Sequence, residues 1–110
     1  MENIQIIGIK ELDEMELEAV NRIASKGYEK IKRELKNDVS IAVHVKGHPK
    51  HGEKKKYGIH VKVIAPTRMF NSTKSVDWNL ETALHGAFDD VVKMIRHAFH
   101  TDDQNKPFTP

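Results

Sequence analysis

Residues 39–66, VSIAVHVKGHPKHGEKKKYGIHVKVIAP, decide the fold of this 110-residue chain. Apolar residues alternate with small or polar ones near both ends of the stretch. The apolar positions are Val39, Ile41, Val43, Val45, Ile59, Val61 and Val63. A period of two is typical of strands that bury one face. The stretch therefore predicts an antiparallel β-hairpin with a long, basic loop over residues 47–56.

A helical pattern precedes the hairpin and another follows it. From Leu12 to about Leu35, apolar residues recur every three or four positions, after acidic residues that suit the positive end of a helix dipole. A second apolar stripe runs from Leu80 to Phe99, and Asp77 is its predicted N-cap. These patterns predict two amphipathic helices.

Each predicted helix contains one glycine, Gly27 in the first and Gly86 in the second. Glycine inside a helix costs about 1 kcal/mol relative to alanine. A close approach of the two helices would explain both residues, and the alternative is that the helices merely tolerate them.

Two shorter segments complete the predicted sheet. Residues 4–7 form a β-type run that ends at Gly8, and residues 68–72 suit a short edge strand after the interruption at Pro66. The order β-α-β-β-β-α predicts an α+β two-layer sandwich, with both helices on one face of a mixed sheet. We expect one domain over residues 1–100 and a disordered tail over residues 101–110.

The composition argues against several functional classes. The chain has no cysteine, no glycine-rich nucleotide loop and no nucleophile motif, so we expect no catalytic residues and no cofactor. The histidine pairs His48/His51 and His97/His100 form no H-E-x-x-H sequence and have no carboxylate placed to serve as a third ligand, so we expect no metal site. No segment has the ~20 apolar residues that span a bilayer. The expected protein is cytoplasmic, without membrane or small-molecule partners.

Positive charge is concentrated in the middle of the chain, although the net charge is only +2. Residues 19–74 contain 14 Lys and Arg and 4 Asp and Glu, a local charge of +10. Clustered positive charge on a small domain favours nucleic acid, because phosphate contacts supply most of the non-specific affinity. Charge runs of this kind can also be solvated surfaces.

Three groups of basic residues are the candidate RNA-binding side chains. The first helix contributes Arg22, Lys26, Lys30 and Arg33, whose spacing places them along one flank. The hairpin contributes Lys46, Lys50, Lys54, Lys55, Lys56 and Lys62, and the second helix contributes Lys93 and Arg96. The first two groups would form one RNA-facing surface if folding placed them on the same side of the domain. On the polar face of the hairpin, His44 and His60 could accept a stacked ring or a phosphate, or be solvated.

Three segments resemble the ribosome hibernation-promoting factor family, which includes protein Y and ribosome-associated inhibitor A. The segments are GYEKIKRELKNDVSIAVHVKG, YGIHVKVIAP and SVDWNLETALHGAFDDVVKMIRHAF, and the resemblance covers about residues 3–100. It implies a fold similar to double-stranded RNA-binding domains. It also implies binding residues at Lys26, Lys30, Arg33, Lys93 and Arg96. The family's last helix usually ends in a dense basic cluster, where this chain has MIRHAFHTDD.

The resemblance implies a ribosome-associated translation inhibitor. Such a protein would bind small-subunit rRNA in the decoding channel and exclude mRNA and tRNA by occupancy. Because the chain lacks the additional C-terminal domain of longer members, we expect a short form. Two alternatives remain, a generic structured-RNA-binding module and a protein-interaction domain that docks an acidic partner.

Overall fold

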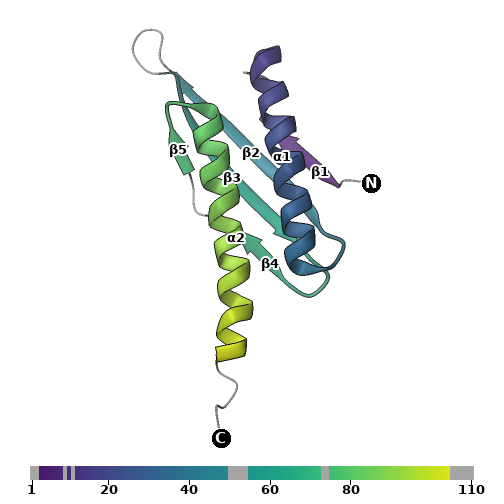
Figure 1. Cartoon of the computed structure of the whole chain (residues 1–110). Coiled ribbons are helices and arrows are strands. Elements are labelled where there is room, and N and C mark those ends of the chain that lie inside the picture. Colours follow the sequence, from purple (N-terminus) through teal and green to yellow (C-terminus); the bar gives the residue numbers. More distant parts are fainter. Residues whose placement is uncertain (1–2, 9, 11, 50–54, 73–74, 105–110) are drawn as a thin grey trace, which may run out of the picture.

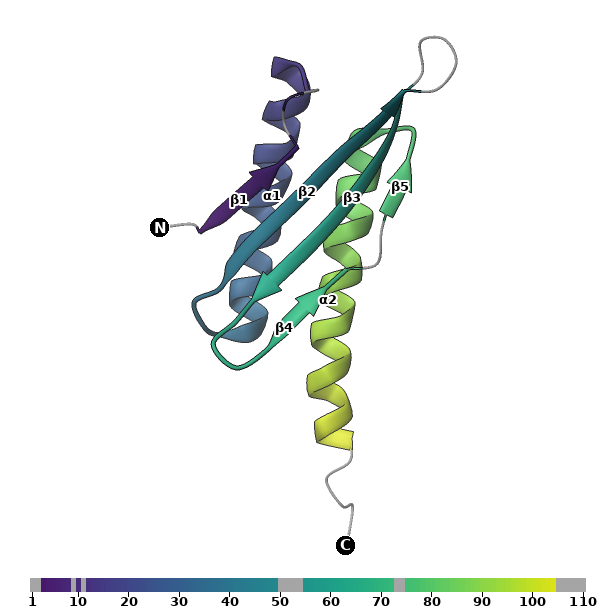
Figure 2. The same cartoon turned by 180° about the vertical axis from the view of Figure 1, so that it is seen from behind.

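The predicted two-layer architecture is confirmed by the computed structural model, which describes residues 3–8, 10, 12–49, 55–72 and 75–104. Two helices lie side by side on one face of a mixed sheet (Figure 1). The opposite face of the sheet is not covered by either helix (Figure 2). The elements in chain order are β1 (Ile4–Ile7), α1 (Glu14–Leu35), β2 (Ser40–Pro49), β3 (Lys55–Ile64), β4 (Met69–Asn71), β5 (Ser75–Asp77) and α2 (Leu80–Gln104).

The hydrophobic core lies between the sheet and the helices. The alternating apolar residues of β2 and β3 point toward the helices, and Val43, Val61 and Val63 are fully buried. From the helices, Ile31, Leu84 and Ile95 are fully buried against this face. At roughly 1.5–3 kcal/mol for each fully buried aliphatic side chain, this core supplies the main favourable term in folding.

The first helix begins at a complete capping box. The side chain of Asp13 accepts a hydrogen bond from the backbone N–H of Glu16 at 2.8 Å, and the carboxylate of Glu16 accepts one from the backbone N–H of Asp13 at 3.0 Å. The other carboxylate oxygen of Glu16 accepts a hydrogen bond from the hydroxyl of Tyr57 on β3. The helix start is therefore tied to the sheet as well as capped.

The central hairpin is longer than the sequence predicts. Antiparallel pairing between β2 and β3 continues through Gly47 with Tyr57, His48 with Lys56, and Pro49 with Lys55. The predicted loop over residues 47–56 was too long at both ends. Residues 47–49 and 55–56 belong to the strands, because their backbone groups form hydrogen bonds in the β2–β3 ladder although most of the side chains are not apolar. Residues 50–54 lie outside the described part of the chain.

The far edge of β3 pairs with two short strands in succession, and the second of them was not predicted. Strand β4 pairs antiparallel with residues 62–64, and β5 pairs antiparallel with residues 57–59. Between them, Ser72 is buried and completes the ladder at Val61. Its backbone N–H donates to the Val61 carbonyl, and its hydroxyl accepts from the Val61 N–H, both at 2.8 Å.

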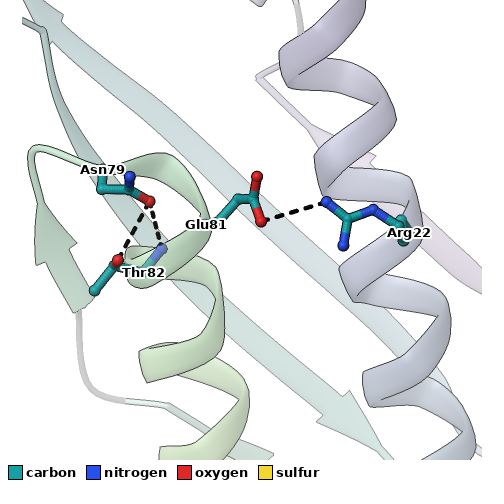
Figure 3. A network of polar contacts seen from close by, with 4 residues as sticks. All are labelled: Arg22, Asn79, Glu81 and Thr82. Atoms are coloured by element: carbon teal, nitrogen blue, oxygen red, sulfur yellow. Dashed lines mark hydrogen bonds and ion pairs between the residues drawn. The ribbon is translucent and has the colours of Figure 1, made fainter.

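The second helix begins two residues later than an Asp77 N-cap allows. Asp77 belongs to β5, and its carboxylate accepts a hydrogen bond from the N–H of Asn79 at 2.9 Å. Asn79 is the capping residue, because its side-chain oxygen accepts from the N–H of Thr82 at 2.9 Å (Figure 3). The helix then continues through Gln104, so residues 101–104 of the predicted tail are helical. Residues 105–110 lie outside the described part.

The two helices run parallel (Figure 1). They approach closely at Gly27. A Cβ atom added at Gly27 would lie 2.3 Å from Cδ1 of the buried Phe88 ring. The predicted close approach is confirmed at this glycine. It was wrong for Gly86, where an added Cβ atom would meet the hydroxyl of Ser75 on β5 at 2.6 Å.

Candidate nucleic-acid interface

The four basic residues of the first helix lie on the outer surface of the helix layer. Arg22, Lys26, Lys30 and Arg33 are all exposed, along the flank of α1 that borders α2. We call this row the helix ladder. The capped helix start and the buried opposite face fix its orientation, so the row is part of the folded surface.

Two ion pairs join α1 to α2, one at the N-terminal end of the helix ladder and one just beyond its C-terminal end. At the N-terminal end, the guanidinium of Arg22 lies 3.3 Å from the carboxylate of Glu81 (Figure 3). Toward the C-terminal end of α1, the carboxylate of Glu34 lies 2.7 Å from Nη2 of Arg96 and accepts a hydrogen bond from its Nε at 2.9 Å. These pairs lie at the surface, where each contributes about 0–1 kcal/mol to stability. Within the described chain, Lys26 makes no ion pair.

The helix layer as a whole carries charges of both signs. Lys30 resembles Lys26 in making no ion pair with any described residue, and Lys93 on α2 is exposed. Glu29 and Asp89 are also exposed on the same two helices. The guanidinium of Arg96, which the sequence assigns to RNA binding, is held by Glu34 and is half exposed. Of the helix ladder, Arg22 is therefore paired with an acidic side chain, whereas Lys26, Lys30 and Arg33 make no ion pair with a described residue.

The strand lysines lie on the opposite side of the domain. Alternation along β2 and β3 places Lys46, Lys56 and Lys62 on the uncovered face of the sheet, which we call the open face (Figure 2). A single RNA-facing surface required the helix ladder and these lysines to lie on the same side of the domain. They lie on opposite sides, so they do not form one continuous surface. Lys50 and Lys54 lie outside the described residues, and Lys55 is placed only by its backbone in β3.

The open face differs from the helix layer in its charge. Among the described strand residues that point to this side, none is Asp or Glu. The lysines are accompanied by His44 and His60, which are directly opposite in the β2–β3 register. Their ring centroids are 5.7 Å apart, with the ring planes inclined by 50°. Beside the two rings, a hollow of about 320 Å³ lies over Gly58.

An exposed aromatic residue follows β5 and lies beside the starts of the two helices, where it lines a hollow with Met15 and Tyr57. The indole of Trp78 is 51% exposed, and Nζ of Lys56 lies 5.5 Å from its ring centroid. The sequence placed His44 and His60 on one face of the hairpin, but their direct pairing depends on the register of β2 and β3, which the sequence pattern does not specify. The position of Trp78 depends on β5, which no sequence pattern indicated.

Another hollow in the described surface contains few charged side chains. It has a volume of about 540 Å³ and lies between the end of α1 and the start of β2. Its two charged residues, Lys32 and Asp38, approach each other to 3.7 Å. In the described ranges, no three His, Asp or Glu side chains are grouped so that they could hold a metal ion. Neither described helix is long and apolar enough to cross a membrane.

Comparison with known proteins gives no family assignment, since neither a family model nor a curated protein matches this sequence.

Proposed function

We propose that this protein is a non-enzymatic translation inhibitor that binds small-subunit rRNA through its helix ladder. The observation that carries the proposal is the exposed positive charge of Lys26 and Lys30, which form no ion pair with any described residue and lie along one helix within the +10 segment of the chain. The sequence resemblance to hibernation-promoting factors supplies the target. The α+β sandwich with parallel helices on one face agrees with the fold that this resemblance implies.

The proposed mechanism requires only that the bound protein fills the decoding channel. Lysine side chains bind phosphates as point charges, so the helix ladder would recognise the shape and backbone of folded rRNA rather than a base sequence. A protein bound in the decoding channel excludes mRNA and tRNA by volume. Arg22 and Arg96 would contribute less than their charges suggest, because Glu81 and Glu34 already neutralise them.

Co-sedimentation with purified ribosomal subunits tests this proposal. The wild-type protein is expected in the small-subunit fraction at low salt and to leave it as salt rises, because released counterions drive the binding. The variant Lys26→Glu/Lys30→Glu should lose most of this binding. If two phosphate contacts are lost, the slope of log K against log salt falls by about 1.8.

A matched variant on the same helix gives the opposite expectation. Glu29 is exposed beside the helix ladder, so Glu29→Gln should strengthen binding without changing the fold. Absence of the wild-type protein from small-subunit fractions at low salt would refute the proposal. Unchanged binding of the folded Lys26→Glu/Lys30→Glu variant would refute the assigned surface.

Two further measurements separate the alternative functions. A free RNA duplex that competes as well as the small subunit would indicate a generic RNA-binding module. Capture of a partner that survives nuclease treatment would indicate a protein-interaction domain with an acidic target.

A further inference from the structure

We infer that the open face is a second binding site, which takes a single-stranded RNA segment. This site lies across the sheet from the helix ladder, and it does not depend on ribosome binding. The features that define it are the His44–His60 pair, Lys46 and Lys62 beside the two rings, and Lys56 farther along β3 on the same face.

The charge of the open face identifies an anionic ligand. The described strand residues on this face include three lysines and no carboxylate, whereas the helix layer mixes both signs. From Lys56 to Lys62 the strand advances by six residues, or about 20 Å. A row of this length can follow several phosphates of one extended strand, and no internal ion pair competes for it: among the described residues, neither Lys46 nor Lys62 has a carboxylate partner.

The rings identify the ligand as an unpaired nucleic-acid strand. Bases stack on aromatic or imidazole rings when they are not held in a duplex, and flat sheets with exposed rings are suited to such stacking. Gly58 has no side chain where the strand faces Lys46, and this leaves the hollow of about 320 Å³ beside the imidazoles. A base can enter this hollow against His60 while Lys46 contacts its phosphate.

A duplex is a poor fit to the same surface. The bases of an A-form helix are stacked inside it, and its deep major groove does not admit a sheet. The imidazole pair would then have no exposed base to contact. The site is therefore expected to prefer a single strand over a duplex of the same length.

Fluorescence anisotropy with a labelled oligouridylate of about ten nucleotides tests this inference. The double variant His44→Ala/His60→Ala is expected to bind about tenfold more weakly, since each stacked base contributes substantially to affinity. The ring-preserving variant His44→Phe/His60→Phe should retain the wild-type affinity within a few-fold. His44 is exposed and His60 half-buried, so the fold should tolerate both pairs, which circular dichroism and urea unfolding would verify.

Charge reversals on the two faces provide the matched control. Lys46→Glu/Lys62→Glu should weaken oligouridylate binding by tenfold or more, whereas Lys26→Glu/Lys30→Glu should change it far less, although both variants alter the net charge equally. In ribosome co-sedimentation, the helix-ladder variant should show the larger defect. Oligouridylate binding without ribosome binding would support the open-face site and refute only the proposed function.

Several results would overturn the inference. They are an absence of oligouridylate binding by the wild-type protein, unchanged affinity of the folded His44→Ala/His60→Ala variant, equal losses from the two charge reversals, and equal competition by a duplex of the same length. A dimer in sedimentation velocity that Ile64→Ser/Met69→Ser dissociates would also overturn it if the dissociated variant still fails to bind oligouridylate. Ile64 and Met69 are directly opposite each other in the β3–β4 register and are two of the exposed apolar residues on this face, so the open face would then be an interface between two copies of the chain.

Discussion

Substitution of Gly27 by alanine is expected to destabilise the domain, although alanine is the better helix former. An added Cβ atom would lie 2.3, 2.6 and 2.9 Å from three carbons of the Phe88 ring. Phe88 is buried, with 4% of its surface exposed, so relief requires the two helices to separate or the ring to leave its packing position. Overpacking of this kind costs about 1–3 kcal/mol. The gain in helix propensity offsets about 1 kcal/mol.

Gly86 supplies the matched control within the same protein. Gly86→Ala has the same propensity gain, but its Cβ would meet the Ser75 hydroxyl, which can rotate away. The propensity terms cancel when the two variants are compared, so Gly27→Ala should be less stable than Gly86→Ala by about 1–3 kcal/mol. Gly86→Ala itself should equal or exceed the wild type.

Urea unfolding followed by circular dichroism measures both free energies. In a second comparison, Phe88→Leu should remove much of the penalty, so that Gly27→Ala costs less in the Phe88→Leu background than in the wild type. If Gly27→Ala is as stable as Gly86→Ala, the helices are not packed closely at Gly27, and the steric argument fails.

Three other substitutions or titrations test individual contacts. Ser72→Ala leaves the N–H of Val61 without its hydroxyl acceptor in a buried position, so we expect a loss of about 1–3 kcal/mol in urea unfolding. Asp13→Ala removes the N-cap of α1 and should cost about 1 kcal/mol, with a smaller loss for Asp13→Ser. Burial, with the hydrogen bond to Glu16 and the charge of that carboxylate, raises the pKa of Tyr57 to about 12. The folded pKa lies above the usual value of 10.0, so the stabilisation is complete below pH 10 and lost as pH rises toward 12. An ultraviolet titration of the wild type against Tyr57→Phe would measure the pKa, and urea unfolding of the two proteins at several pH values would measure the loss of stability.

The sequence was sufficient for the elements with a long, strict period. Both helices, the central hairpin and the layer that each face occupies follow from the spacing of apolar residues. The short strand β5 has no such period, because it contains three residues and its pairing depends on where β3 presents a free edge. The same strand displaced the cap of α2, since Asp77 is held in the ladder and Asn79 becomes the first residue free to cap.

The candidate site was harder to predict than the fold because charge along a sequence does not specify a side of the molecule. Lys26 and Lys46 belong to one +10 segment, but the first lies on a helix and the second on the strand face that points away from it. Ion pairs also reduce the number of basic residues that are available to bind RNA. The partner of Arg22 is 59 residues away, and that of Arg96 is 62 residues away, so only the folded chain shows that these charges are neutralised.

The opposed positions of the two surfaces change what a basic domain of this size can do. A single continuous patch would bind one RNA segment, and all of its lysines would contribute to one salt-dependent affinity. Two surfaces separated by the sheet and helix layers cannot contact the same short segment together. If both bind, loss of either surface should reduce affinity for a folded RNA far more than for a short oligonucleotide, because the second contact is made at a high effective concentration once the first has formed. The ratio of these two losses therefore distinguishes a domain held between two RNA segments from one that lies on a single RNA surface.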